Sequence, residues 1–192
     1  MPKFLPQSLP DVVLVEPDVH HDPRGFFVET WQIERYREAG IGPDFVQDNH
    51  SRSKHGILRG LHLQVAHPQG KLVRVVEGEV YDVAVDVRRG SPHFGRHFGI
   101  LLSAKNFTQL WVPPGFAHGF LVTSEAAQFE YKCTDLYHPE DELSILWNDP
   151  ELGISWPIES PSLSAKDADA PTLAEAMDRL PVYRADSGNS DG

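Results

Sequence analysis

Alternating apolar and polar residues in the middle of the chain predict a series of short β-strands. In Glu79–Val87, four apolar side chains alternate with two aspartates and an alanine, which is typical of a strand with one packed face. The run before it, Lys71–Val76, ends at a Glu-Gly pair that marks a tight turn. Further short strands, separated by turn residues, are predicted at Phe98–Leu102, Gln109–Val112, Phe116–Val122, Gln128–Thr134 and Leu143–Trp147. Many short strands at this spacing predict an all-β fold, an antiparallel β-sandwich or jelly roll.

Helical patterns are few and short. Trp31–Ala39 can form one helix, and Gly40 follows it as a stop signal. Near the C-terminus, Thr172 and Glu175 fit a capping box ahead of a second helical run. The apolar stripe of this run consists of Leu173, Met177 and Leu180. We therefore expect a C-terminal helix that lies on the β-body.

The composition is that of an ordinary globular domain. Of the 192 residues, 40% are hydrophobic and 23% are charged, which excludes disorder over most of the length. We expect a single domain over residues 1–183. Residues 184–192 are polar and rich in Gly and Ser, so we expect them to form a disordered tail.

Charge, cysteine content and the first residues exclude several functional classes. Asp and Glu number 28 against 17 Lys and Arg, and the net charge of −11 argues against nucleic acid as a partner. The single cysteine, Cys133, excludes an intramolecular disulfide framework and a cysteine-rich zinc site. The chain opens with no long apolar run behind a basic flank, so we expect neither a signal peptide nor a membrane anchor. The expected location is the cytoplasm.

Two of the ten histidines lie among large apolar residues. His62 belongs to the segment LRGLHLQ, and His118 belongs to PPGFAHGF. A low-dielectric environment disfavours the charged imidazole and suits a neutral imidazole that acts as a base. A core histidine bonded to a carbonyl group is the alternative interpretation for each.

The same segments bear on metal binding. Cupin-type β-sandwich enzymes commonly hold a metal through an HxH pair on one strand and a third histidine in a PxGxxH segment. Here the PxGxxH segment ends at His118, but the HxH position reads His62-x-Gln64. Two scattered imidazoles are a poor transition-metal site, because such a site usually takes three or more protein ligands. The sequence therefore predicts no metal and no other cofactor, and leaves both histidines available for proton transfer.

Other candidate residues are cationic or acidic. The cations suggest an anionic ligand, because Arg matches phosphate geometry, although surface ion pairs are the alternative for each. They are Arg24, Arg59, Lys71 and Arg74. Tyr131 lies in phase with Phe129 and Cys133, so it is either a core residue or an acid that faces a histidine. Asp167 can orient a histidine or cap the C-terminal region.

Taken in order, the motifs resemble those of the dTDP-4-dehydrorhamnose 3,5-epimerase family. The N-terminal motifs are HHDPRGFF from His20, FVQDNHS from Phe45, LRGLHLQ from Leu58, GKLVR from Gly70 and PPGFAHGF from Pro113. Tyr131-Lys132, Tyr137-x-Pro139-x-x-Glu142, Trp147-Asn-Asp-Pro150 and Leu163-Ser-Ala-Lys-Asp167 follow. The resemblance covers about Leu9 to Tyr183 and implies a metal-free, cupin-like jelly roll that works as a homodimer on a dTDP-sugar.

The resemblance also implies roles for individual residues. His62 is similar to the family's proton-abstracting base, with Asp167 behind it, and Tyr131 is similar to the opposing proton donor. Lys71 is placed to stabilise an enolate. The implied contacts to the nucleotide sugar are Arg24, Glu29, Gln47, Asp48, Asn49, Arg59, His118, Glu142 and Lys166, and Tyr137 resembles the aromatic residue that stacks on thymine.

These residue types fit the implied reaction. C3 and C5 of the sugar flank the C4 keto group, so loss of either proton gives an enolate. Inversion needs a base on one face, an acid on the other and a cation at the oxygen. One feature fits poorly: Arg59 and His62 are three residues apart, and a regular strand sends them to opposite faces. Gly60 between them can provide a bulge that re-aims one side chain.

Several alternatives remain open at the level of sequence. An epimerase that inverts only C3 or only C5 shares these motifs, and the motifs do not separate the two. A 3,4-ketoisomerase fits the positions of Tyr131 and Lys71 less well. Gln64 argues against a metal-dependent oxygenase. A non-catalytic sugar-binding protein would keep Arg59 and Tyr137 but would have no need of His62 opposite Tyr131.

Overall fold

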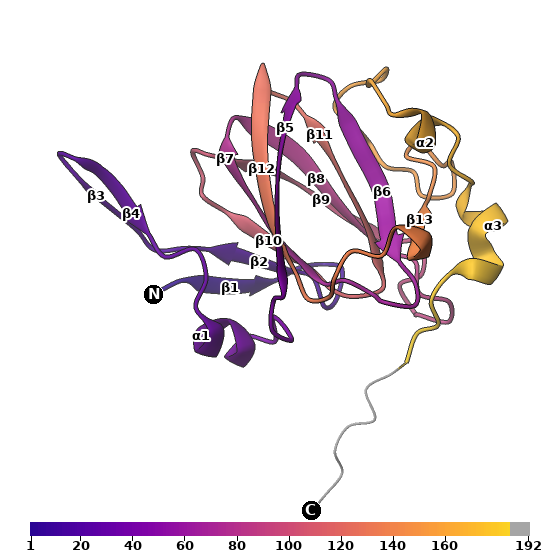
Figure 1. The fold of residues 1–192 in the computed structure, drawn as a ribbon, viewed down its shortest axis with the longest axis horizontal. Helices are drawn as coiled ribbons and strands as arrows, with labels where there is room; N and C mark the ends of the chain where they lie inside the picture. Colours follow the sequence, from indigo (N-terminus) through magenta and orange to yellow (C-terminus); the bar gives the residue numbers. More distant parts are fainter. Residues whose placement is uncertain (185–192) are drawn as a thin grey trace, which may run out of the picture.

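The computed structural model describes residues 1–184, which form two antiparallel β-sheets packed face to face (Figure 1). The six-stranded sheet has the order β1-β2-β10-β7-β12-β5. Its strands are β1 (Lys3–Pro6), β2 (Val13–Glu16), β10 (Gln109–Val112), β7 (Lys71–Glu77), β12 (Ala126–Cys133) and β5 (Gln47–Lys54). The five-stranded sheet has the order β13-β6-β11-β8-β9. Its strands are β13 (Glu142–Ser144), β6 (Leu58–Gln64), β11 (Phe116–Val122), β8 (Glu79–Asp86) and β9 (His97–Ser103). This arrangement confirms the predicted all-β sandwich.

A separate hairpin and a few short helices complete the structure. The hairpin is β3 (Val19–Asp22) and β4 (Gly25–Val28), and Figure 1 shows it projecting away from the two sheets. The helices are α1 (Ile33–Glu38), α2 (Ala165–Ala168) and α3 (Leu173–Ala176), with 3₁₀ turns η1 (Pro139–Asp141) and η2 (Met177–Arg179).

The main core fills the space between the sheets. Val73, Val75 and Phe129 of the six-stranded sheet meet Phe116 and Phe120 of the five-stranded sheet, all almost fully buried. Burial of apolar surface of this kind contributes about 25 cal/mol per Å² and is the main stabilising contribution to the fold. The candidate site borders this core, since Phe120 and Phe129 also line its cavity.

The C-terminal segment covers the outer face of the five-stranded sheet. Leu173 and Leu180 are each 2% exposed and pack on that face with Met177, which confirms the predicted apolar stripe. The capping box is present as well, because the Thr172 side chain accepts from the Glu175 backbone N–H and Glu175 accepts from that of Thr172. Each such cap contributes about 1 kcal/mol to helix stability. The C-terminal helix is therefore bound on the β-body as expected.

The expectation that β8 packs on one face only is wrong. Val83 and Val85 lie under the C-terminal segment, while Asp82 and Ala84 point between the sheets, and all four are fully buried. The C-terminal cover makes the outer face a second interior. The aspartates that suggested a solvated face are held by other side chains instead, as Asp82 shows below.

Strand boundaries agree with the sequence pattern at the centre of the chain and differ at its end. The predictions for β10 and β11 have the observed bounds. The predicted strand Leu143–Trp147 is shorter, because β13 ends at Ser144. Beyond that point the Leu146 N–H donates to the Pro171 carbonyl, so the backbone leaves the sheet to pair with the C-terminal segment.

None of the helices in the described residues is long and apolar enough to cross a membrane. Eight of the nine residues of the predicted polar tail, 184–192, lie outside the described part of the chain. The single-domain boundary and the cytoplasmic location stay predictions.

Candidate active site

A cavity of about 390 Å³ opens between the sheets and brings together residues far apart in the sequence. A second hollow of about 280 Å³ adjoins it, and both are lined by His62, Lys71 and Tyr131. His62 lies on β6 of one sheet, whereas Lys71 and Tyr131 lie on β7 and β12 of the other. The predicted base and the predicted acid therefore border one cavity from opposite sheets.

His62 is paired with Asp167. The two atoms His62 Nε2 and Asp167 Oδ1 are 2.6 Å apart, and Asp167 is 3% exposed. Asp167 sits in α2, which Ser164 caps by accepting from the Asp167 backbone N–H at 3.1 Å. Burial would raise the pKa of Asp167, but the hydrogen bonds from His62 and Ser164 outweigh it and lower the pKa. The carboxylate thus stays ionised behind the imidazole and can stabilise its protonated form.

A glycine bulge lets Arg59 and His62 share the cavity. His62 pairs with His118 of β11, and Arg59 pairs with Phe120. Between these two pairs β6 therefore has one more residue than β11. Gly60 lies in between with φ of +137°, and a Cβ built there would come within 2.5 Å of the Gly119 Cα. Only glycine fits such a position. The predicted bulge at Gly60 is therefore confirmed.

Tyr131 and Lys71 occupy desolvated positions on the six-stranded sheet. Burial, with smaller contributions from Cys133 and Glu142, raises the pKa of Tyr131 to about 12. Burial lowers the pKa of Lys71, although the nearby Cys133, Glu142 and Asp82 oppose that shift. Tyr131 is thus a phenol that keeps its proton, and Lys71 is a poorly solvated cation beside it.

A second histidine–aspartate pair joins His118, which lines the first cavity, to the fully buried Asp82. His118 Nε2 is 3.0 Å from both carboxylate oxygens of Asp82, and the two residues are 6% and 0% exposed. Sequence reasoning missed Asp82. The signal that could have found it is that Asp82 lies in phase with the apolar Ala84 in a mostly apolar strand, because a buried carboxylate needs a partner.

The second hollow gathers several of the residues that the resemblance assigns to the nucleotide sugar. The Tyr137 hydroxyl donates to Glu142 Oε2 at 2.9 Å, and Lys166 pairs with the same carboxylate. Burial would raise the pKa of Glu142, but Lys166, His62 and Tyr137 together lower it. Gln47 Oε1 accepts from the Tyr137 backbone N–H at 2.9 Å. Asn49 completes this part of the lining.

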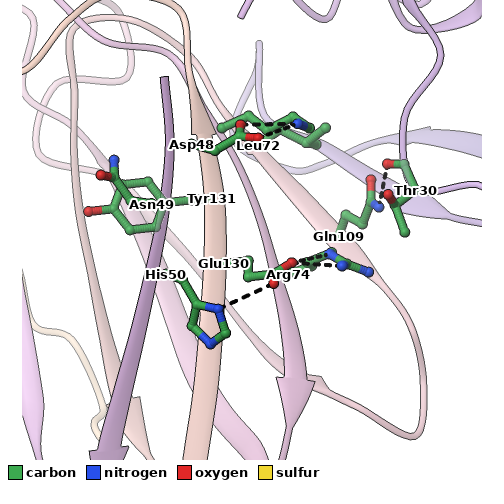
Figure 2. A pocket seen from close by; sticks show the side chains of 10 residues that line it. Thr30, Asp48, Asn49, His50, Leu72, Arg74, Gln109, Glu130 and Tyr131 are labelled. Atoms are coloured by element: carbon green, nitrogen blue, oxygen red, sulfur yellow. Dashed lines mark hydrogen bonds and ion pairs between the residues drawn. The ribbon is translucent and has the colours of Figure 1, made fainter. Parts of the chain in front are cut away.

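Not every predicted residue reaches the cavity, because adjacent residues of a strand face opposite sides. Asp48 faces the outer side of β5 and pairs with Lys132, unlike Gln47 and Asn49 on either side of it. Figure 2 shows Asn49 and Tyr131 pointing away from Arg74 on the outer surface. There Arg74 binds Glu130 at 2.7 Å. The expected cluster of four cations is therefore divided, and Arg74 is a surface ion pair.

Arg24 and Glu29 also lie outside the cavity of their own chain. Arg24 is on the projecting hairpin, where its guanidinium binds Asp22. Glu29 follows β4 and pairs with Arg35 at 2.8 Å. Within one chain these two residues do not join the other predicted contacts.

Gln64 has a structural role. Its Nε2 donates to the carbonyl oxygens of His67 and Leu136 at 2.7 and 3.0 Å, and its Oε1 accepts from the His138 N–H at 2.8 Å. The amide that replaces the second histidine of an HxH pair is thus fully used in holding two loops.

Comparison with known proteins identifies the family of the chain. Residues 6–175 match the model of the dTDP-4-dehydrorhamnose 3,5-epimerase family. The epimerase of that name from Pseudomonas aeruginosa is 56% identical over 171 residues, which cover 88% of this chain and 94% of the relative. The one from Neisseria gonorrhoeae is 52% identical over 189 residues, covering 96% of this chain, and the chain spans 58% of that relative's length.

A solved structure extends the similarity to three dimensions. The dTDP-6-deoxy-D-glucose-3,5-epimerase of Legionella pneumophila, in complex with dTDP-4-keto-L-rhamnose, is 51% identical to this chain. The two superpose with a TM-score of 0.94 over 96% of this chain and all of that one. On its motifs, its fold and these matches, the chain belongs to the dTDP-4-dehydrorhamnose 3,5-epimerase family.

Proposed function

We propose that the chain inverts C3 and C5 of dTDP-4-dehydro-6-deoxy-D-glucose to give dTDP-4-dehydro-L-rhamnose. The observation that carries this proposal is the His62–Asp167 pair in one cavity with Tyr131 and Lys71. The relatives reported above are named for inversion at both carbons, which supports two inversions over one.

The reaction follows from the positions of the four side chains. Neutral His62 removes the proton from a carbon next to the C4 keto group, and the C–H electron pair moves into an enolate. Asp167 stabilises the imidazolium, and Lys71 stabilises the charge on the enolate oxygen. Tyr131 then gives its proton to the opposite face of the same carbon.

The proton balance sets what happens between the two inversions. After one inversion His62 holds an extra proton and Tyr131 is a phenolate. Both return to their starting state by exchange with solvent before the second carbon reacts. A deuteron from heavy water is therefore incorporated at each inverted carbon.

Proton NMR of the 4-keto sugar nucleotide with enzyme in heavy water tests the proposal. We expect the C3 and C5 proton signals both to disappear, at rates that need His62. Exchange at only one carbon would identify a single-centre epimerase. Binding of the nucleotide sugar without exchange at either carbon would identify a sugar-binding protein.

We infer in addition that the working unit is a symmetric homodimer in which the β3–β4 hairpin reaches the neighbour's cavity. Phe26 and Phe27 on this hairpin are 60% and 69% exposed, which is unusual for two adjacent aromatic side chains. Arg24 lies beside them, away from the cavity to which the resemblance assigns it. A two-fold arrangement would supply both a cover for the aromatic residues and an arginine for the diphosphate.

A further inference from the structure

Three side chains with metal-binding atoms gather in two loops next to Gln64, Gln69 and Tyr137, which line the second hollow, and all three are outside the set used for proton transfer. They are His67, Asp135 and His138, and their ligand atoms all lie within 4.8 Å of one another. His67 precedes β7, and the other two residues follow β12, on either side of Tyr137. Two loops thus bring together two imidazoles and one carboxylate.

Buried amide side chains fix the backbone of all three residues. Gln64, 4% exposed, binds the His67 carbonyl and the His138 N–H. Gln69, 9% exposed, donates to the Asp135 carbonyl at 2.8 Å. The loops are therefore held in place before any ligand arrives, which removes part of the entropic cost of binding.

The three side chains are all at least partly exposed. The rings of His67 and His138 stack with centroids 4.1 Å apart and planes inclined by 20°, and both are partly exposed. Asp135 Oδ1 accepts from the Leu136 N–H, whereas Oδ2 faces His67 Nδ1 at 3.9 Å. Glu140, 3.6 Å from His138 Nδ1, offers a further oxygen. A small rotation of each ring would point the three ligand atoms at one ion.

We propose that His67, Asp135 and His138 bind one divalent transition-metal ion, such as Zn²⁺ or Cu²⁺. Imidazole and carboxylate donors suit these borderline ions rather than Mg²⁺ or Ca²⁺. A bound ion would tie the turn before β7 to the loop that carries Tyr137. The proposal does not depend on the epimerase activity, because none of the three residues belongs to the proton-transfer set.

Calorimetric titration of the full chain with ZnCl₂, after chelator treatment and dialysis, tests the proposal. We expect one ion to bind per chain with release of protons from the ligands. His67→Asn and Asp135→Asn should each weaken binding by at least about tenfold, since even the loss of an outer-shell partner costs a site that much. Asp135→Asn keeps the oxygen that caps Leu136, so the loop should retain its shape. His55→Asn, which removes an exposed imidazole elsewhere, is the matched control and should bind like the wild type.

Two results would overturn the proposal. One is a wild-type chain that binds no Zn²⁺ at neutral pH. The other is a Zn²⁺ affinity that is unchanged in Asp135→Asn and His67→Asn. The heat measured in the titration would then come from Zn²⁺ bound to other histidines. Activity is a separate measurement: the stripped enzyme should remain fully active, because the catalytic residues need no metal. Activity lost with the ion and restored by it would move the metal into the reaction and contradict the mechanism, but not the binding site.

Discussion

His62 and Tyr131 border one cavity from opposite sheets, so removing each should stop inversion in a different way. His62→Asn should abolish both deuterium exchange and epimerisation, because no enolate forms. Tyr131→Phe leaves the base in place, so the enolate still forms and takes its proton back on the original face. We expect epimerisation to fall by roughly 10²–10⁴-fold in Tyr131→Phe while exchange at C3 or C5 falls much less.

The measurement is proton NMR in heavy water, with exchange and inversion followed in the same sample. Near-normal inversion at both carbons in Tyr131→Phe would contradict the assignment and leave Tyr131 as a core residue. Another group would then have to supply the proton.

The lowered pKa of Lys71 predicts the alkaline limit of activity. In the proposed reaction Lys71 can stabilise the enolate only while it is protonated, so kcat should fall as the pH rises through its pKa, which lies below the ordinary value of 10.5. Tyr131, with a pKa of about 12, keeps its proton over that range and does not cause this fall in kcat. Lys71→Arg retains a cation whose pKa is above about 12. The kcat of this slower variant should therefore no longer fall at alkaline pH.

The pH–rate profile of kcat checks this prediction. If kcat of Lys71→Arg still falls at the same alkaline pH, the fall belongs to the titration of another group. Lys71→Met serves as the control, because it removes the cation altogether and should be slow at every pH.

At the residue scale, the sequence allowed His62, Asp167, Lys71 and Tyr131 to be predicted because they lie in recognisable motifs. Asp82 could not be predicted in the same way, since its partner His118 lies on a neighbouring strand and the pairing depends on register. The assignment of three consecutive residues, Gln47 to Asn49, to one ligand ignored the alternation of a strand. The structure places the middle one, Asp48, on the outer face.

At the scale of elements, the bulge at Gly60 decides whether β6 can deliver two side chains to one cavity. Gly60→Ala should destabilise the fold by more than the roughly 1–3 kcal/mol of a strained backbone, because the added Cβ also meets the Gly119 Cα at 2.5 Å. Gly153→Ala is the matched control: its φ is also positive, at +57°, but a Cβ there has no neighbour within 4 Å. It should cost about 1–2 kcal/mol.

Urea unfolding of both variants provides the free energies. The outcome that contradicts the prediction is a Gly60→Ala chain that is as stable as Gly153→Ala. In that case the strands would be able to separate at the bulge, and the bulge would not be what fixes Arg59 and His62.

Short, mostly apolar runs between turn residues, such as β10 and β11, were predictable with their bounds. Strand β5 was not predictable, because its sequence QDNHSRSK has no apolar residue. One of its faces lines the cavity and the other carries ion pairs, so function has replaced the hydrophobic pattern that marks a strand. The pattern also could not show that the C-terminal segment covers β8, since that contact joins distant parts of the chain.

At the scale of the whole molecule, the projecting hairpin predicts a dimer. Sedimentation should give a mass near twice 21.5 kDa, because two exposed phenylalanines and a displaced arginine need a partner surface. Arg24→Ala should keep that mass and lose affinity for the nucleotide sugar. A stable monomer with full activity would exclude the arrangement. The resemblance implies a homodimer, but the hydrophobic pattern of the sequence does not indicate that this hairpin projects from the sheets.

The same hairpin has a consequence for mixtures of defective chains. If each cavity takes Arg24 from one chain and His62 from the other, neither lesion alone leaves a working homodimer. A hybrid of the two contains one cavity with both defects and one cavity with none. Random exchange of subunits would then restore about a quarter of the cavities. Two inactive alleles would complement each other in one cell, as separate genes do, although each encodes the whole enzyme.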